Sequence, residues 1–344
     1  ASRGRYSTDA SIYQIEPVGV LVPKTEDDVA TALQIAAAHQ VPVLARGGGT
    51  SQCGQTVGAA LVIDDSKHLR EITALDLDRG EVEVQPGIAL DALNAALKKH
   101  GVWHPVDVST SAQATLGGMA GNNSCGSRSI AYGNMVHNVR GIDAWLGDGS
   151  QATFGLFDEA TGRARELGEA LRLLAEQHRA EIDAWWPKVM RRVGGYNLDV
   201  FQPQSERPYR DDGRVNLAQL LVGSEGTLAF FRRLRLALSP LPAHRVLGVV
   251  NFPTFHRAMD SAQHIVRLGP TAVELVDRTM IDLARANPAF RPVIESALIG
   301  QPAAILLVEF AGAELSPLLA QLSRLEDLIG ELGLPNAVVP LTDD

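Results

Sequence analysis

Residues 45–55 read ARGGGTSQCGQ and lie between two apolar stretches, residues 41–44 and residues 59–63. Glycine has no Cβ, so a run of glycines lets several backbone N–H groups point into one concavity, where they can bind an anion. Arg46 adds a positive charge to this loop, in a chain whose formal net charge is -9. The segment therefore predicts an anion-binding loop between two strands, and a pyrophosphate is the anion that we favour.

Three kinds of phosphate-binding loop can be compared with this segment. A Rossmann loop needs Gly-x-Gly-x-x-Gly before a helix, but this spacing is absent and a strand is predicted to follow. A P-loop needs Gly-x4-Gly-Lys-Ser/Thr, and Gly49–Thr56 departs from it because Gln55 stands where the lysine should be. The third kind is a flavin pyrophosphate loop set between strands. A plain flexible turn remains the alternative to all three.

Two further segments have the same small, polar character. Residues 109–126 read STSAQATLGGMAGNNSCG, and residues 223–228 read GSEGTL between two apolar runs. A disordered stretch would usually bring charge and proline, which both segments largely lack. Such segments can wrap closely around a large ligand and offer backbone and hydroxyl hydrogen bonds. Three of them on one chain suit a ligand as long as FAD.

The order of these motifs resembles the FAD-binding domain of the vanillyl-alcohol oxidase / p-cresol methylhydroxylase (PCMH) superfamily. Within it, the chain is most similar to the D-lactate dehydrogenase and glycolate oxidase D-subunit group. That group shows Pro before a helix, Arg-Gly-Gly-Gly-Thr, Pro-Gly, Ser-Thr, Thr-Ile/Leu-Gly-Gly, Gly, Tyr-Gly and Glu-Gly-Thr in this order. The matching residues, within roughly residues 12–240, are Pro23, Arg46 to Thr50, Pro86, Gly87, Ser109, Thr110, Thr115 to Gly118, Gly126, Tyr132, Gly133 and Glu225 to Thr227.

The resemblance implies roles for these residues in binding FAD. Residues 47–51 would hold the pyrophosphate, and residues 115–118 and 122–126 would line the flavin. Members with a covalent histidyl flavin carry His where Thr50 stands, so the resemblance implies FAD held without a covalent bond. The residues expected to contact the cofactor are Arg46, Gly47, Gly48, Gly49, Thr50, Ser51, Gly54, Gln55, Pro86, Gly87, Ser109, Thr115, Leu116, Gly117, Gly118, Gly121, Asn122, Asn123, Ser124, Gly126, Tyr132, Gly133, Val139, Glu225 and Gly226.

The same resemblance implies the reaction. A D-2-hydroxy acid of the lactate, glycolate or 2-hydroxyglutarate class would be oxidised to the 2-oxo acid, with hydride transfer to flavin N5. The electrons would then pass to a quinone, a cytochrome or an iron–sulfur domain. Two alternatives stay open: a non-catalytic flavin subunit that relays electrons, and a nucleotide-binding regulator that uses Gly49–Thr56.

No catalytic residue and no metal ligand can be assigned from the sequence. The resembled dehydrogenases place metal-binding and catalytic histidines around a Gly-Asp-Gly-Asn-x-His-like motif, which is absent here. We expect the chain to be an N-terminal fragment, because Ala1 is not a start methionine and residues 342–344 follow an apolar run. That motif, and any iron–sulfur domain, would then lie beyond Asp344. Histidines in the sequence are predicted to be structural, among them His104, His137, His244, His256 and His264.

Composition excludes several classes of protein. The chain has 344 residues, of which 45% are hydrophobic and 21% charged, as in an ordinary globular protein of two domains. Its acidic balance and lack of a basic stripe argue against nucleic acid as a partner, and no apolar run approaches the length of a membrane span. Two cysteines, Cys53 and Cys125, cannot form a disulfide framework. We therefore expect a cytoplasmic protein, with the inner-membrane surface as the other location considered.

The predicted fold class is α+β, with a two-subdomain PCMH-type FAD-binding domain and a ferredoxin-like cap. The first domain would span residues 1–240, with subdomains at about 12–75 and 80–240, and Pro240-Leu241-Pro242 would mark its end. Residues 18–63 predict strand, helix, strand, loop and strand, and residues 167–193 predict one long helix, broken at Pro187, with Trp185-Trp186 as packing residues.

The cap would span residues 243–344 and be incomplete. Strands are predicted at residues 245–252, 271–276, 303–310 and 337–341, and helices at residues 254–268, 280–298 and from 316. This alternation is typical of a ferredoxin-like sheet. In the resembled family the cap covers the flavin and shapes the substrate pocket.

Overall fold

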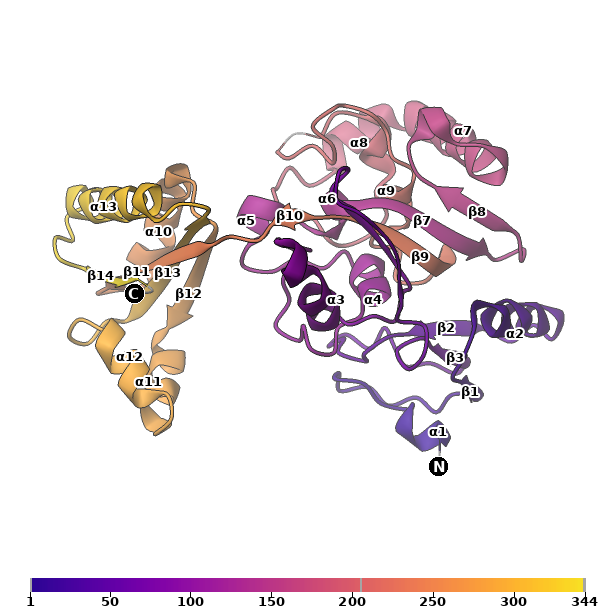
Figure 1. Cartoon of the computed structure of the whole chain (residues 1–344), viewed down its shortest axis with the longest axis horizontal. Coiled ribbons are helices and arrows are strands. Elements are labelled where there is room, and N and C mark those ends of the chain that lie inside the picture. The colour runs from indigo at the N-terminus through magenta and orange to yellow at the C-terminus, as the bar shows by residue number, and fades with distance from the viewer. Residues whose placement is uncertain (1, 205, 343–344) are drawn as a thin grey trace. The chain divides into compact units, whose positions relative to one another are not determined.

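A computed structural model of the chain describes residues 2–204 and 206–342. The described chain forms two compact units (Figure 1). The first unit runs up to Gly126 and then from Gly133 to Pro240, and the second runs from Leu241 onward and also includes Ser127–Tyr132. Both units combine helices with sheets, so the predicted α+β class is confirmed.

The first unit begins with a small parallel sheet in the order β1-β3-β2. Its helix α2 starts at a capping box, in which the Thr25 hydroxyl accepts from the Asp28 N–H and the Asp28 carboxylate accepts from the Thr25 N–H. The predicted order of strand, helix, strand, loop and strand is confirmed. The elements are α1 (Ser2–Arg5), β1 (Gly19–Leu21), α2 (Glu26–Ala38), β2 (Val43–Arg46) and β3 (Leu61–Asp64).

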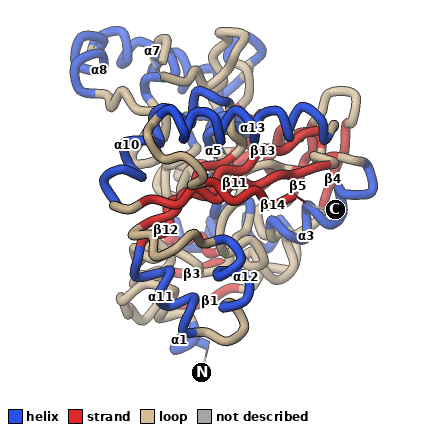
Figure 2. The backbone as a smooth tube through the Cα atoms, turned by 90° about the vertical axis from the view of Figure 1, so that its left-hand side faces the viewer, coloured by secondary structure: helices blue, strands red, loops and turns tan. Residues whose placement is uncertain are grey.

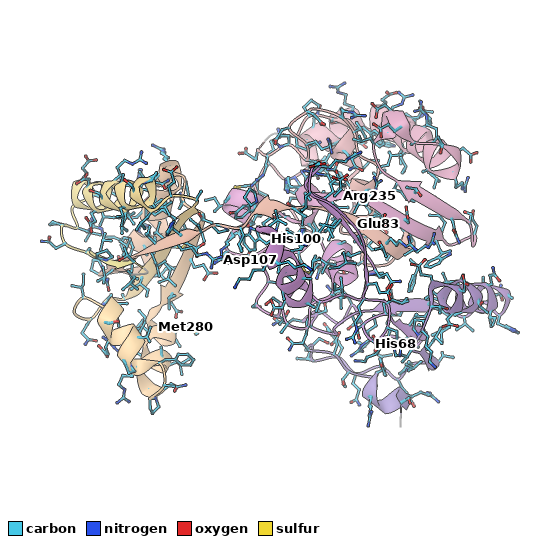
Figure 3. All side chains as sticks on the ribbon, in the orientation of Figure 1. His68, Glu83, His100, Asp107, Arg235 and Met280 are labelled. Carbon is cyan, nitrogen blue, oxygen red and sulfur yellow. The ribbon has the colours of Figure 1, made fainter. Side chains whose placement is uncertain are left out.

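A five-stranded antiparallel sheet forms the rest of this unit, in the order β4-β5-β9-β7-β8. Glu83 of β5 and Arg235 of β9 occupy paired positions in it (Figure 3). The strands are β4 (Ile72–Asp76), β5 (Glu81–Val84), β7 (Val139–Leu146), β8 (Gln151–Phe154) and β9 (Ala229–Ala237). Because β4 already belongs to this sheet, the second subdomain begins before residue 72, earlier than the predicted change between 75 and 80.

Helices and short strands pack around the five-stranded sheet. Its main core buries Leu93, Leu97, Leu116, Met135 and Leu234 completely. The remaining elements of the unit are α3 (Leu90–Leu97), η1 (Lys98–His100), β6 (Val102–Trp103), α4 (Leu116–Gly121), α6 (Met135–Asn138), η2 (Phe157–Glu159), α7 (Gly162–Gln177), α8 (Arg179–Trp185), η3 (Leu198–Phe201), α9 (Ala218–Leu221) and β10 (Ser239–Pro240).

The predicted long helix over residues 167–193 is wrong in three respects. The structure has two helices, α7 and α8, with a break at His178, and the chain after Trp185 is irregular. Trp185 does not pack, because it is 84% exposed. Trp186 contacts Arg192, whose guanidinium lies 5.9 Å from the centre of the ring. The apolar spacing therefore predicted helical structure correctly, but it did not predict where the two helices begin and end.

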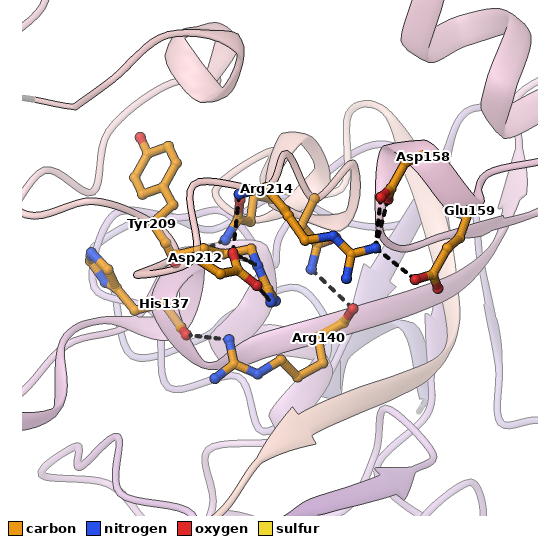
Figure 4. A network of polar contacts seen from close by, with 10 residues as sticks. His137, Arg140, Asp158, Glu159, Tyr209, Asp212 and Arg214 are labelled. Carbon is orange, nitrogen blue, oxygen red and sulfur yellow. Dashed lines mark hydrogen bonds and ion pairs between the residues drawn. The ribbon is translucent and has the colours of Figure 1, made fainter. Parts of the chain in front are cut away.

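Residues 209–216 are fastened to β7 and to its neighbours by a polar network (Figure 4). The side chain of Asn216 donates to the carbonyl of Arg140 over 3.0 Å, and Arg140 donates to the carbonyl of His137 over 3.2 Å. Arg214 binds both Asp158 and Glu159. This network holds an otherwise irregular segment against the sheet.

The second unit is a four-stranded antiparallel sheet in the order β12-β13-β11-β14. Helices α10 and α13 cover one face, and α11 and α12 lie on the other (Figure 2). This order is that of a ferredoxin-like βαββαβ sheet with α11 and α12 inserted, so the predicted cap fold is confirmed. The elements are α5 (Ser129–Tyr132), β11 (His244–Phe252), α10 (Phe255–Ile265), η4 (Val266–Leu268), β12 (Ala272–Asp277), α11 (Arg278–Ala286), α12 (Arg291–Ala297), β13 (Ala304–Gly312), α13 (Leu315–Glu331) and β14 (Val338–Thr342).

Two adjacent carboxyl groups at the end of β3 are predicted to affect stability in opposite directions. Asp64 accepts hydrogen bonds from the Tyr6 hydroxyl at 2.6 Å and from Ser66, whereas Asp65 Oδ1 is buried and has no partner among the described residues. Burial, with the charge of Asp64, raises the pKa of Asp65 well above its usual value. The folded state is therefore penalised at pH values above the unfolded pKa of about 4. At pH 7 we expect Asp65→Asn to raise the free energy of unfolding by about 1–3 kcal/mol and Asp64→Asn to lower it.

Urea unfolding of both variants at pH 7 and pH 4.5 measures this difference. The advantage of Asp65→Asn should shrink at the lower pH, because the unfolded carboxyl group then also takes up protons. An Asp65→Asn variant less stable than wild type at pH 7 would contradict the prediction.

His104 is predicted to make the first unit less stable in acid. Its ring is completely buried, with Nδ1 3.1 Å from the carbonyl oxygen of Ala237, and burial lowers its pKa to about 4. Between pH 6.5 and 4 the unfolded chain binds a proton that the folded chain does not, so stability is lost as the pH falls through this window. The full loss is about 3 kcal/mol. We expect His104→Gln to flatten the dependence of the unfolding free energy on pH, measured from pH 7 to pH 4.5; an unchanged slope would refute the assignment.

Candidate functional site

The loop after β2 lies directly against the small-residue segment that begins near residue 109. A Cβ atom on Gly47 would lie 2.0 Å from the Thr115 hydroxyl oxygen, and one on Gly48 would lie 2.1 Å from the carbonyl oxygen of Gln113. Cβ atoms do not approach other atoms so closely, so only glycine fits at both positions without a backbone shift. The structure thus brings together the two segments that the sequence assigned to one ligand.

The Arg46 guanidinium is engaged by backbone carbonyls of the protein. It donates to the carbonyls of Tyr6, Thr8 and Thr56 and lies 5.1 Å from the centre of the Tyr6 ring. These bonds fasten the N-terminal segment beneath the loop. The guanidinium also lies beside the loop, because a Cβ atom on Gly49 would be 2.7 Å from Arg46 Nη2, so the positive charge supports the backbone of the loop.

The backbone N–H groups of the loop are hydrogen-bond donors that could bind a ligand. Within residues 2–204 and 206–342, the N–H groups of residues 47–51 donate no hydrogen bond to a protein acceptor. Gly49 has a positive φ of 67°, which only glycine adopts without strain, and its carbonyl oxygen accepts from the N–H of Ala10. A carbonyl tied back in this way leaves the neighbouring N–H groups as the polar surface of the loop, as a site for a pyrophosphate requires.

The start of α4 packs against residues 86–87. The N–H of Gly117 donates to the carbonyl of Pro86 over 2.8 Å, and a Cβ atom on Gly117 would lie 2.6 Å from the Pro86 side chain. A Cβ atom on Gly87 would lie 2.0 Å from the carbonyl oxygen of Asp65. Glycine at position 117 therefore lets α4 pack closely on Pro86, and glycine at position 87 lets the backbone there pack closely on Asp65.

The third predicted segment pairs with the end of the second. The N–H groups of Gly223 and Glu225 donate to the carbonyls of Ala120 and Gly121, each over 2.9 Å. Asn123 and Glu225 have positive φ values of 53° and 52°, conformations that cost energy for residues other than glycine. Gln40 and Asn336 adopt the same conformation outside the site, so these angles describe the turns of the two segments and do not by themselves mark a site.

A polar contact links this third segment back to the loop. The Gln55 side chain donates to Glu225 Oε1 over 3.4 Å, and Gln55 also bonds the Ser51 hydroxyl. Burial raises the pKa of the Glu225 carboxyl group above its usual value. Gln55 is thus engaged inside the site, and strand β3 follows the loop where a P-loop would begin a helix, so the structure excludes the P-loop geometry.

Residues 192–196 adjoin the site and were missed by the sequence reasoning. The Asn123 side chain donates to the carbonyl of Arg192 over 3.2 Å, and a Cβ atom on Gly223 would lie 3.2 Å from the carbonyl oxygen of Gly195. The Tyr196 and Thr227 hydroxyl groups are 2.8 Å apart. The Gly194-Gly195 pair was the available signal, and it lay directly after the stretch predicted as helix, residues 167–193.

Several residues expected to contact the cofactor have surroundings within the protein that can be described. Val139 and Leu116 are completely buried in the main core, so their side chains cannot line an open site. Gly133 packs against His137, and Tyr132 groups with the second unit. The described residues contain no group of three or more His, Cys, Asp or Glu side chains suited to a metal ion, and none of the described helices is both long and apolar enough to cross a membrane.

Comparison with family models agrees with this geometry. Residues 17–155 match the model of an FAD binding domain, and residues 241–343 match the C-terminal domain of FAD linked oxidases. The first match contains the loop after β2 and most of the residues assigned to the site. The two matches confirm the resemblance to PCMH-type FAD oxidases.

Individual proteins show the same similarity. D-2-hydroxyglutarate dehydrogenases of Pantoea ananatis and Escherichia coli are 32% and 33% identical over 94% and 91% of this chain. The chain spans about a third of the length of these relatives, 33% and 31%. The solved structure of an alkyldihydroxyacetonephosphate synthase aligns with 94% of this chain and 52% of its own, with a TM-score of 0.66 and 19% identity, which shows a shared fold.

The contact between the two loops predicts a specific steric effect. We expect Gly48→Ala to lower the free energy of unfolding by about 1–3 kcal/mol, because the new methyl group would displace the backbone at Gln113. Gly147→Ala is the matched control, since a Cβ atom there meets no atom within 4 Å. Urea unfolding at pH 7 compares the two variants, and equal stability of both would show that the loops do not touch as described.

Proposed function

We propose, on the premise that this chain belongs to the FAD-linked oxidase family, that it binds FAD without a covalent bond and serves the oxidation of a D-2-hydroxy acid. The pyrophosphate would lie on the N–H groups of residues 47–51. The flavin would lie along residues 117–126 and 223–226. The observation that carries this proposal is the packing of Gly47 and Gly48 on residues 113–115, because it joins two glycine-rich segments into one cradle lined by backbone donors.

The residues present fit a bound dinucleotide. The cradle is formed mainly by backbone, which can approach phosphates closely, and it needs no lysine. Thr50 stands where the resembled covalent flavoproteins have histidine, so the chain offers no imidazole at that position. Gln55, held between Ser51 and Glu225, would fix the far side of the cradle. These features support FAD held by shape and hydrogen bonds alone.

The proposed reaction removes two electrons from the substrate. Bound FAD would supply the acceptor, flavin N5, for the hydride of the carbinol carbon, and the hydroxyl proton would go to a base. We assign no residue of this chain to that base. The residues of this chain would bind and orient the cofactor, and the electrons would leave to a quinone, a cytochrome or an iron–sulfur domain. Lactate, glycolate and 2-hydroxyglutarate are the substrates to compare, and the names of the relatives favour 2-hydroxyglutarate.

A flavin subunit that only relays electrons is the second candidate. The described residues hold no metal-ligand group, and burial lowers the pKa values of His104 and His137 to about 4. Neither imidazole is therefore exposed and poised near neutral pH to act as a base. With these two imidazoles set aside as the base, a chain that binds flavin and relays electrons is the second candidate.

FAD binding is predicted to depend on the charge placed at Gly48. We expect Gly48→Asp to weaken FAD binding at least about tenfold more than Gly48→Asn, which adds a side chain of the same size without the charge, because a carboxylate in the cradle repels the pyrophosphate. Gly147→Asp adds the same charge to an exposed turn and should bind FAD as the wild type does. Titration of FAD fluorescence with each purified chain measures the difference. Full affinity in Gly48→Asp would place the phosphates elsewhere.

The reaction is tested on the complete polypeptide that carries this chain, loaded with FAD and without oxygen. Loss of the visible flavin absorption on addition of D-lactate or D-2-hydroxyglutarate, but not of the L enantiomers, is the expected result. A flavin that dithionite reduces and that no hydroxy acid reduces would favour the electron-relay function for this chain.

A further inference from the structure

One short segment of the chain belongs to a different unit from its neighbours in sequence. Residues 127–132 group with the second unit, whereas the residues up to Gly126 and from Gly133 group with the first. Within this segment, α5 contacts β12 of the second unit (Figure 2). The cofactor-lining stretch 117–126 is thus followed at once by residues that are part of the other unit.

An ion pair holds the segment on the second unit. Arg128 Nε and Nη2 donate to the two carboxylate oxygens of Glu309, each over 2.9 Å. Both side chains are largely shielded from water, with relative exposures of 24% and 17%. Two parallel bonds from a guanidinium to a carboxylate fix orientation as well as distance. The pair therefore fixes the direction of the segment on the sheet.

Glu309 is a rigid anchor for this pair. It lies on the central strand β13, paired with Leu247 of β11 and Ala272 of β12, and its carbonyl accepts from the N–H of Thr271 over 2.7 Å. Side chains alternate along a strand, so Glu309 shares a face with Ile305. Helices α11 and α12 cover this face at Ile305, and α5 covers it at Glu309.

The residues on either side of this segment, 123–124 and 135–136, are hydrogen-bonded to each other at the proposed cofactor site. The N–H of Met135 donates to the carbonyl of Ser124, and the N–H of Val136 donates to the side chain of Asn123, each over 3.0 Å. Residues 124–135 therefore form a loop with a closed base. Asn123 and Ser124 are part of the stretch proposed to line the flavin, and the tip of the loop carries Arg128.

We propose that Arg128 is a positioning residue, whose pair with Glu309 makes loop 124–135 a link between the cofactor-lining stretch and the second unit. The tip follows the sheet of the second unit, because Glu309 holds it. The base follows the cofactor-lining stretch, because two hydrogen bonds close it there. A displacement of either unit is then transmitted to the other through the loop. The part of this inference that concerns FAD rests on the proposed function.

Hydrogen–deuterium exchange of the whole chain without FAD tests the link. We expect Arg128→Gln to raise the exchange rate at residues 129–132, and also at the amides of Met135 and Val136, at least about tenfold. The double variant Arg128→Glu with Glu309→Arg should restore slow exchange, because it rebuilds the pair with its charges exchanged. Asp282→Asn is the control, since it breaks the exposed Arg278–Asp282 pair of the same unit and should leave these amides unchanged.

Each outcome decides one part of the inference. Unchanged exchange at residues 129–132 in Arg128→Gln would overturn the anchoring role of Arg128. Faster exchange at residues 129–132, with Met135 and Val136 unaffected, would overturn the transmission to the base.

The same exchange measurement with saturating FAD then distinguishes a failure of the link from a failure of the proposed function. In the wild type, FAD should slow exchange at residues 119–126 and at β12, and in Arg128→Gln only the first effect should remain. Protection of β12 that survives in Arg128→Gln would overturn the link. A wild-type chain whose residues 119–126 show no response to FAD would contradict the proposed function, while the comparison without FAD still tests the link.

Discussion

The architecture of the first unit depends on one close approach between backbones. Residues 47–48 and residues 113–115 come so near to each other that a single methyl group at Gly47 or Gly48 would overlap Thr115 or Gln113. The Thr115 side chain packs on Gly47, and the atoms nearest to Gly48 belong to the backbone of residues 113–114, so peptide groups make up much of the polar surface there. Peptide N–H groups are fixed in direction by the chain itself, so a cradle built from them is preorganised and needs few charged side chains. This explains how a chain with net charge -9 can present a concavity suited to an anion.

Sequence reasoning located most of the fold and the central part of the site. It found the strands and helices of the second unit, because their apolar spacing is regular and their helices end at glycine or proline. It also found the residues around 47–51, 115–118 and 223–226, because glycine clusters stand out from their surroundings. These features depend on local sequence, in which each residue constrains only its near neighbours. The pairing of the segments in space was expected only from a resemblance, and the structure supplies the contacts that produce it.

The features that sequence reasoning missed have a common physical origin. Arg46 lies in the predicted loop, and its guanidinium is engaged by the carbonyls of Tyr6, Thr8 and Thr56, which no local pattern reveals. The break at His178 and the exposure of Trp185 depend on where the core ends, and hydrophobicity alone cannot locate that boundary. In these cases tertiary contacts determined which partners a side chain binds and where a helix ends, and the local sequence does not reveal those contacts.

The division of the chain into units raises a related point about function. A cap that is joined to a cofactor domain at its own N-terminal connection alone could change position without disturbing the cofactor. Here a second connection exists, because residues 127–132 complete one face of the cap sheet while both of their ends return to the cofactor-lining stretch. In the role proposed for Arg128, a substitution in β13 is expected to act through loop 124–135 on the stretch assigned to the flavin, although Arg128 and Glu309 lie some 180 positions apart in the chain.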